Sequence, residues 1–170
     1  NKHVLTEARM AMNAQQAHEM LEAALRNPNL ITQIVPFADV MTLEKKIAQL
    51  IINGYLGELI AVDLAYGGPG SNNNGFIDYN SLFDWRHNRD LSGYNTMLMG
   101  AWYEVIMRII GPASSVKAYT KTYGTVRLDN LGQHHVISVP DHVEILCNMA
   151  SGPIAHMRFS EVTGLSQQQL

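Results

Sequence analysis

The sequence predicts an α/β segment followed by an α+β domain. This prediction rests on a change in the spacing at which apolar residues recur along the chain. Near the N-terminus an apolar run, an amphipathic helix and a second apolar run follow one another, the order typical of a parallel βαβ unit. From about residue 58 onward, segments of period two outnumber helices. We therefore expect an incomplete βαβ unit over residues 1–38 and an α+β domain over residues 39–170.

Composition excludes several classes of protein. Of the 170 residues, 46% are hydrophobic and 16% are charged, and the formal net charge is -3. This balance argues against disorder, nucleic-acid binding and electrostatic attachment to a membrane. The apolar stretches are shorter than the roughly 20 residues that a spanning helix needs. A single cysteine, Cys147, allows no internal disulfide, and no signal segment opens the sequence, so we expect a cytoplasmic protein.

Residues that typically begin or end helices and strands define the elements of the first segment. Asn13 and Gln16 form a capping-box pattern, and apolar residues then recur at helical spacing until Asn27-Pro28 ends the helix. A short strand over residues 30–37 is closed by Pro36. Parallel strands are seldom left uncovered, so we expect their missing neighbours to lie before Asn1, and the second domain to be incomplete at its C-terminus.

The second segment is expected to form a mostly antiparallel or mixed open sheet, with helices covering one face. Helices are predicted over residues 42–53 and 94–110, and the second of these should be largely buried. Strands are predicted over residues 58–66, 116–123, 142–149 and 154–162, with a turn at Ser151-Gly152 and a plain loop over 67–75. The uncovered face is expected to be exposed or to carry homo-oligomer formation.

Three stretches resemble one protein family. Residues 2–11, KHVLTEARMA, are similar to its strand-and-turn motif KHVLCEKPLA. Residues 51–59, IINGYLGEL, are similar to its ELIxxGxIGEI motif, and residues 84–93 match WRxDPxLSGGG in Asp84-Trp85-Arg86 and Leu91-Ser92-Gly93. Their order and spacing over the whole chain resemble the glucose-fructose oxidoreductase, inositol dehydrogenase and rhizopine-catabolism family of NAD(P)-dependent oxidoreductases.

The resemblance implies a fold, a cofactor and a substrate class. Members have a Rossmann domain with a G-x-G-x-x-G loop and an α+β second domain whose open sheet often packs in oligomers. This sequence has no such glycine loop after a strand. The resemblance therefore implies a central segment of such an enzyme, with NAD or NADP as cofactor and a sugar or polyol as substrate.

The family's proton-handling residues do not carry over. They are the Lys of its EKP motif and an Asp-x-x-x-His pair on the third helix, and these positions fall on Ala8, Leu98 and Trp102. Glu104 lies about 200° around the helix from position 102, so it cannot take over. Arg9, next to the lost lysine, is a poor proton donor because its pKa exceeds about 12. The catalytic residues therefore remain unknown at the level of sequence.

The resemblance also suggests binding residues, each with a plainer alternative. Glu7 and Arg9 are candidates for cofactor binding, although Glu7 could simply be solvated. We expect a substrate cavity beside them, lined by Arg86, Tyr94, Asn95 and Trp102. Alternatively, Arg86 is a surface cation over Trp85, and Trp102 belongs to the core.

No metal site is expected, because the adjacent His134 and His135 on a strand point to opposite faces.

Three functions stay open. The first is a segment of a sugar or polyol dehydrogenase. The second is a non-catalytic relative that serves as a sugar sensor or scaffold. The third, an isolated interaction domain, requires that the chain be complete.

Overall fold

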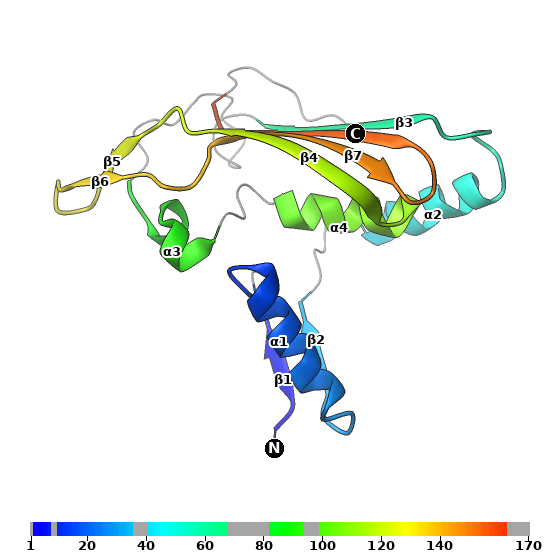
Figure 1. Ribbon diagram of the computed structural model, residues 1–170, viewed down its shortest axis with the longest axis horizontal. Coiled ribbons are helices and arrows are strands. Elements are labelled where there is room, and N and C mark those ends of the chain that lie inside the picture. The colour runs from blue at the N-terminus through cyan, green and yellow to red at the C-terminus, as the bar shows by residue number, and fades with distance from the viewer. Residues whose placement is uncertain (1, 8–9, 36–40, 68–81, 94–98, 163–170) are drawn as a thin grey trace.

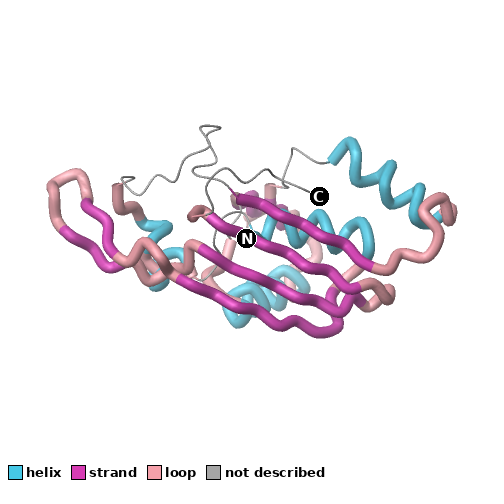
Figure 2. The backbone as a smooth tube through the Cα atoms, turned by 90° about the horizontal axis from the view of Figure 1, so that it is seen from above, coloured by secondary structure: helices cyan, strands magenta, loops and turns pink. Residues whose placement is uncertain are grey.

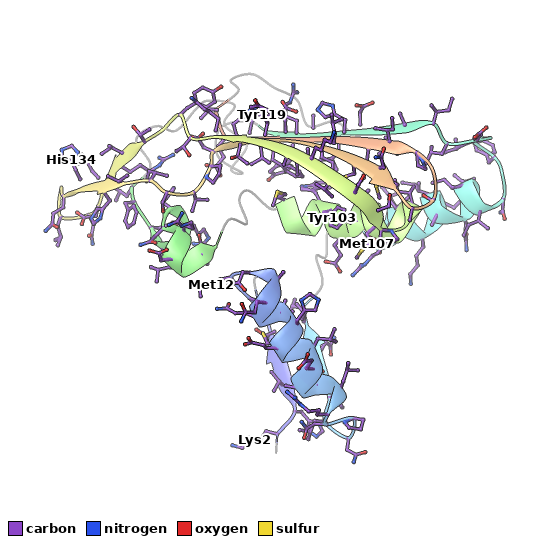
Figure 3. The ribbon with its side chains drawn as sticks, in the orientation of Figure 1. Lys2, Met12, Tyr103, Met107, Tyr119 and His134 are labelled. Atoms are coloured by element: carbon purple, nitrogen blue, oxygen red, sulfur yellow. The ribbon has the colours of Figure 1, made fainter. Side chains whose placement is uncertain are left out.

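The computed structural model describes residues 2–7, 10–35, 41–67, 82–93 and 99–162. A small N-terminal unit projects from a larger layered unit, in which a curved sheet lies over helices (Figure 1). Figure 3 shows Met12, just before the helix of the small unit, at the point where the two units approach each other.

The small unit is a strand, a helix and a parallel strand, as predicted. Strand β1 (Val4–Thr6) pairs in parallel with β2 (Thr32–Ile34), and helix α1 (Ala14–Leu25) connects them. The Asn13 side chain accepts a hydrogen bond from the Gln16 backbone at 3.0 Å, while the Gln16 side chain accepts one from the Met12 backbone at 3.0 Å. The predicted cap is therefore present, with its return bond one residue earlier than in an ideal capping box.

The large unit contains one four-stranded mixed sheet. Its strands are β3 (Ala61–Gly67), β4 (Ala113–Lys121), β7 (His142–Met149) and β8 (Ile154–Ser160), in the order β3-β8-β7-β4. Strand β3 is parallel to β8, and the other neighbours are antiparallel. The prediction that these four segments share a sheet is confirmed.

Two helices cover one face of this sheet, as Figure 2 shows from above. They are α2 (Met41–Ile52) and α4 (Met99–Ile110). Alternate residues of β7 and β8 face the helices and are buried, so the strand period of two is directly visible in the burial pattern. The buried core side chains are Leu64, Ile106, Ile110, Val143, Ile145, Cys147, Met149, Ala155, Met157 and Phe159.

The predicted turn between the last two strands is also confirmed. The Gly152 backbone donates a hydrogen bond to the Met149 carbonyl at 3.0 Å, and Gly152 has a φ of +118°. A side chain would be strained at that angle, which explains the glycine at this position.

Several short elements were not predicted. They are the hairpin strands β5 (Val126–Leu128) and β6 (His134–Val136), the 3₁₀ helix η1 (Trp85–His87) and helix α3 (Arg89–Ser92).

The expectation that α4 is largely buried is wrong for its side away from the sheet, where Met107 is exposed. The predicted loop over 67–75 and the start of the helix at 94–98 lie largely outside the described residues. None of the described helices is long and apolar enough to span a membrane.

Candidate functional site

The two units touch at a glycine of the family motif. Gly93 follows α3 with a φ of +66°, and it is buried. A Cβ atom built on Gly93 would collide with the carbonyl oxygen of Met12. Only glycine therefore allows the backbone after α3 to lie directly on the backbone before α1.

Ser92, the residue before it, closes the same turn. Its side chain is buried, and its hydroxyl lies 3.0 Å from the carbonyl oxygens of both Arg86 and Asn88. The hydroxyl thereby holds α3 against η1. In the sequence, Ser92 and Gly93 stand out only as part of a motif. The structure shows that they form the joint, the place where the η1–α3 segment contacts the backbone before α1.

A capping box at the start of η1 holds this segment in place. The Asp84 side chain accepts from the Arg86 backbone at 2.8 Å, and His87 Nδ1 accepts from the Asp84 backbone at 3.0 Å. Burial, and then the positive charge of Arg127, lower the pKa of His87. A neutral ring is the form that can accept this bond, so the pKa direction and the geometry agree.

Arg86 lies on the surface of this segment. Its guanidinium stands 4.5 Å from the centre of the Trp85 ring and forms an ion pair with Asp84 at 3.3 Å. This is the arrangement of the plainer alternative, a cation over an aromatic ring. Its contact with a substrate hydroxyl stays a prediction.

Trp102 packs against the sheet. Its ring centre lies 5.7 Å from that of Tyr66 on β3, and Tyr66 in turn lies 6.4 Å from Phe159. Burial, and then the negative charge of Glu161, raise the pKa of the Tyr66 phenol. Trp102 thus belongs to the aromatic side of the core, while its correspondence to the family's histidine and its role as a cavity wall stay predictions.

Glu104 faces a different element. It forms an ion pair with Arg108 one turn later, and Arg108 also reaches Glu44 on α2 at 3.1 Å. Arg108 therefore links α4 to α2, and Glu104 is engaged with Arg108 on the same helix, which agrees with the helical-wheel argument that Glu104 cannot replace a group at position 102.

Of the remaining candidate binding and catalytic residues, Glu7 lies in the part of the chain that the structure describes. Glu7 is exposed directly after β1. Ala8, Arg9, Tyr94, Asn95 and Leu98 lie outside the described residues. Within the described ranges, no group of three or more His, Cys, Asp or Glu side chains is placed to hold a metal ion. His134 is exposed while the His135 ring stacks on Phe83 at 4.3 Å, so the predicted opposite orientation of the two histidines is confirmed.

A groove of about 400 Å³ lies on the small unit and is lined by both strands and by α1. Apolar side chains form much of its wall, and Lys2 also lines it. The apolar residues are Val4, Met20, Leu21 and Ile34. No side chain of α1 is fully buried. A parallel sheet is ordinarily covered on both faces, so this groove is an uncovered packing surface.

Solved structures share this fold over nearly the whole chain. An NAD-binding oxidoreductase from Klebsiella pneumoniae is 27% identical and matches 95% of the chain with a TM-score of 0.79. Levoglucosan dehydrogenase is 19% identical over 95% of the chain, with a TM-score of 0.81. A super-repressor mutant of Gal80p from Saccharomyces cerevisiae is 16% identical over 97%, with a TM-score of 0.74. This is the fold of the glucose-fructose oxidoreductase, inositol dehydrogenase and rhizopine-catabolism family.

The family resemblance predicted from three motifs is thereby confirmed at the level of fold. Among the similar structures, levoglucosan dehydrogenase occurs with NADH and levoglucosan and with NADH and L-sorbose, so NAD is a cofactor of this fold. The chain spans 42% of the Klebsiella protein, 43% of levoglucosan dehydrogenase and 44% of Gal80p. No protein-family model and no curated protein sequence matches it.

Proposed function

We propose that this chain is the central part of an NAD- or NADP-dependent oxidoreductase that acts on a sugar or polyol. The observation that carries the proposal is the match of nearly the whole chain to NAD-binding oxidoreductases, across both units at once. The Gly93 joint supports it, because the joint keeps the connection between β1 and α1 beside the η1–α3 segment.

In this proposal residues 1–38 are the last βαβ part of a Rossmann domain, and residues 39–170 form much of the substrate domain. The apolar groove on the small unit is then the surface on which earlier strands of the Rossmann domain pack. Dinucleotides bind outside the carboxyl ends of such parallel strands. Glu7 occupies this location after β1, and its exposed carboxylate can accept hydrogen bonds from ribose hydroxyls.

The bound nicotinamide would supply or accept the hydride, and the protein would orient the sugar. The residues of this chain proposed for that task are Arg86, Tyr94, Asn95 and Trp102. Aromatic rings suit the apolar faces of a sugar ring, while a guanidinium and an amide suit its hydroxyl groups.

A second candidate is a non-catalytic relative that senses a sugar or serves as a scaffold. The packing of Trp102 on Tyr66 favours it, because an indole in the aromatic core cannot transfer the proton that a histidine would. Ala8 and Leu98 at the other two family positions point the same way.

The cofactor part of the proposal is tested with the full-length protein that contains this chain. NADH fluorescence is titrated against the wild type, Glu7→Ala and a control, Glu22→Ala, on the exposed side of α1. Loss of a hydrogen bond to a charged group should weaken binding by about tenfold or more in Glu7→Ala. The control should bind like the wild type. A full-length protein that does not bind NADH or NADPH would contradict the proposal.

A further inference from the structure

His87, the last residue of η1, has no role in the family resemblance, because it stands at a variable position of the motif that residues 84–93 match. Its side chain is 20% exposed. Its ring packs near Phe83, with the ring centres 5.9 Å apart, and its carbonyl accepts a hydrogen bond from the Ser138 backbone at 3.2 Å. Both the ring and the backbone of His87 are therefore held in place.

His87 Nδ1 lies within reach of two different partners on Asp84. The Asp84 backbone nitrogen is 3.0 Å away, and the Asp84 carboxylate oxygen Oδ1 is 3.1 Å away. A neutral ring with its lone pair on Nδ1 accepts the hydrogen bond from the backbone. A protonated ring cannot accept, and its Nδ1–H donates to the carboxylate instead. One proton therefore exchanges one partner for the other.

The same carboxylate positions Arg86. Asp84 Oδ1 accepts a hydrogen bond from the Arg86 backbone at 2.8 Å, and Oδ2 pairs with the Arg86 guanidinium at 3.3 Å. The Ser92 hydroxyl donates to the Arg86 carbonyl at 3.0 Å, which connects this turn to the Gly93 joint. A proton on His87 Nδ1 competes with Arg86 for Asp84, so the protonation state of His87 is coupled to the placement of Arg86.

Three charged groups face the His87 ring, and they act in both directions. Arg127 on β5 and Arg86 on η1 disfavour the charged ring, while Asp84 favours it. Burial is the largest influence, and the net result is a pKa of His87 below its ordinary value. The neutral ring is therefore the form present at neutral pH, with an alternative partner already beside it.

A second histidine lies close enough to require a control. The hairpin of β5 and β6, called here the β5–β6 arm, projects from the end of the large sheet (Figure 1). On this arm the His135 ring stacks on Phe83 at 4.3 Å, and its Nε2 lies 2.8 Å from the Asp129 carboxylate. Phe83 thus contacts both histidines, and a titration of His135 has to be separated from one of His87.

We propose that His87 is a positioning residue for Arg86 and that a proton switches it. The neutral ring accepts from the Asp84 backbone and leaves the Asp84 carboxylate to Arg86. The protonated ring takes the carboxylate, and Arg86 is released. Because the pKa of His87 is lowered on folding, the positioned state is present at neutral pH and is lost as the pH falls below about 6.5 through the lower folded value.

The release of Arg86 does not depend on a ligand. Only its consequence for substrate binding rests on the proposed function. If Arg86 contacts a sugar hydroxyl, the affinity for the sugar falls in acid together with the neutral form of His87.

The experiment is NMR of the full-length protein that contains this chain, without ligand, between about pH 8 and about pH 4.5. Selective ¹⁵N labelling reports the backbone amides of Asp84 and Arg86 and the ring nitrogens of His87. His87→Asn keeps an acceptor oxygen but does not titrate, and His87→Phe keeps a ring without an acceptor. His135→Asn is the control for the neighbouring histidine.

In the wild type, the Asp84 and Arg86 amides should titrate together with the His87 ring, with a midpoint below about 6.5. His87→Asn should resemble the wild type at neutral pH and show no transition, whereas His87→Phe should be displaced at every pH. His135→Asn should keep the wild-type transition. A transition that persists in His87→Asn, or a wild-type His87 with the proton on Nδ1 at neutral pH, would overturn the proposal, and the latter needs no variant.

Kinetics separates this inference from the proposed function. For the best substrate in a panel of polyols, the KM of the wild type should rise by about threefold or more between about pH 7 and about pH 5.5, with a smaller change in kcat. The KM of His87→Asn should not follow this rise. Equal pH profiles alongside the NMR transition would contradict the substrate contact of Arg86 and leave the positioning by His87 established.

Discussion

At the scale of single residues, Gly93 controls how the two units meet. Its backbone conformation is one that side chains adopt only with strain, and a Cβ atom added to it would collide with the Met12 carbonyl. Gly54 offers a matched case, with a φ of +70° but nothing within 4 Å of an added Cβ. Comparing the two positions therefore separates backbone strain from collision.

Gly93→Ala should lower the free energy of unfolding by about 2–5 kcal/mol, because strain and collision add. Gly54→Ala should cost about 1 kcal/mol, from strain alone. Urea unfolding followed by circular dichroism measures both. Equal costs at the two positions would show that the Met12 contact is dispensable.

Glu44 is the other residue whose environment predicts a clear effect. It is 6% exposed and pairs with Arg108, whose pKa is raised by the hydrogen bond that the guanidinium donates to Glu44, with the charge of Glu104 contributing. Removing one partner of a fully buried pair costs about 3–5 kcal/mol. Arg108 keeps Glu104 and about a third of its side chain is in solvent, so the cost should be smaller.

We expect Glu44→Ala to destabilise the protein by about 1–2 kcal/mol, because the remaining guanidinium loses its buried partner. The exposed pair of Glu22 and Arg26 on α1 is the control, and Glu22→Ala should cost under about 0.5 kcal/mol. Both values come from chemical denaturation at neutral pH. A Glu44 effect no larger than the control would contradict a structural role for the pair.

At the scale of elements, one aspartate organises the turn of the β5–β6 arm. Asp129 Oδ1 accepts from the backbones of Leu131 at 2.8 Å and Gln133 at 2.9 Å, while Oδ2 meets His135. The hydrogen bond with His135, followed by the one from Gln133, holds the pKa of Asp129 below its usual value. The ionised carboxylate is therefore the form that stabilises the arm.

The sign of the pH dependence follows from that direction. A lowered pKa means that the stabilisation is present above the ordinary carboxyl pKa and is lost as the pH falls through the lower folded value. Amide NMR signals of Leu131 and Gln133 should therefore change below about pH 4. In Asp129→Asn the same signals should be displaced already at pH 7 and show no acid transition. Matching titrations in both proteins would contradict the assignment.

Elements were predictable from sequence in proportion to their length. The twelve-residue helix α1 and the strands β7 and β8 show enough periods for a pattern to be recognised. The strands β5 and β6, of three residues each, do not, and they depend on Phe83 and Asp129 for support. The local turn at Asp129 and the tertiary contact with Phe83 specify them instead of a repeated pattern.

The candidate site, too, could be predicted from the sequence only in part. The sequence motif included Ser92 and Gly93 but did not show that they form the joint, because the collision with Met12 that explains the glycine involves a residue about 80 positions away. Helical spacing correctly separated Glu104 from Trp102, because both lie on one regular element. It could not show that Trp102 packs on Tyr66.

At the scale of the whole molecule, the chain has the fold of NAD-binding oxidoreductases, but its sequence contains no G-x-G-x-x-G loop after a strand. Tight dinucleotide binding of this type depends on a glycine loop at a helix N-terminus, and the sequence contains none after a strand. The isolated chain should therefore not bind NADH tightly in a fluorescence titration. Micromolar affinity would contradict this expectation.

Activity of the full-length protein is a separate question, because it depends on proton transfer. General acid–base catalysis supplies about 10²–10⁴-fold of a rate, and Ala8, Leu98 and Trp102 can supply none of it. We therefore expect the full-length protein to bind NADH but to turn over a panel of polyols weakly.

Introducing a single titratable group at one of the proposed proton-transfer positions tests this expectation. Trp102→His would open space beside Tyr66, so Ala8→Lys is the better variant, with Ala11→Lys as a control for added charge. Ala8→Lys should raise kcat and introduce a pH dependence, because the amine titrates, whereas Ala11→Lys should do neither. Steady-state kinetics across pH measure both. Robust turnover by the unmodified protein would show that another group moves the proton, and Arg9 and Tyr94 would be the first to substitute.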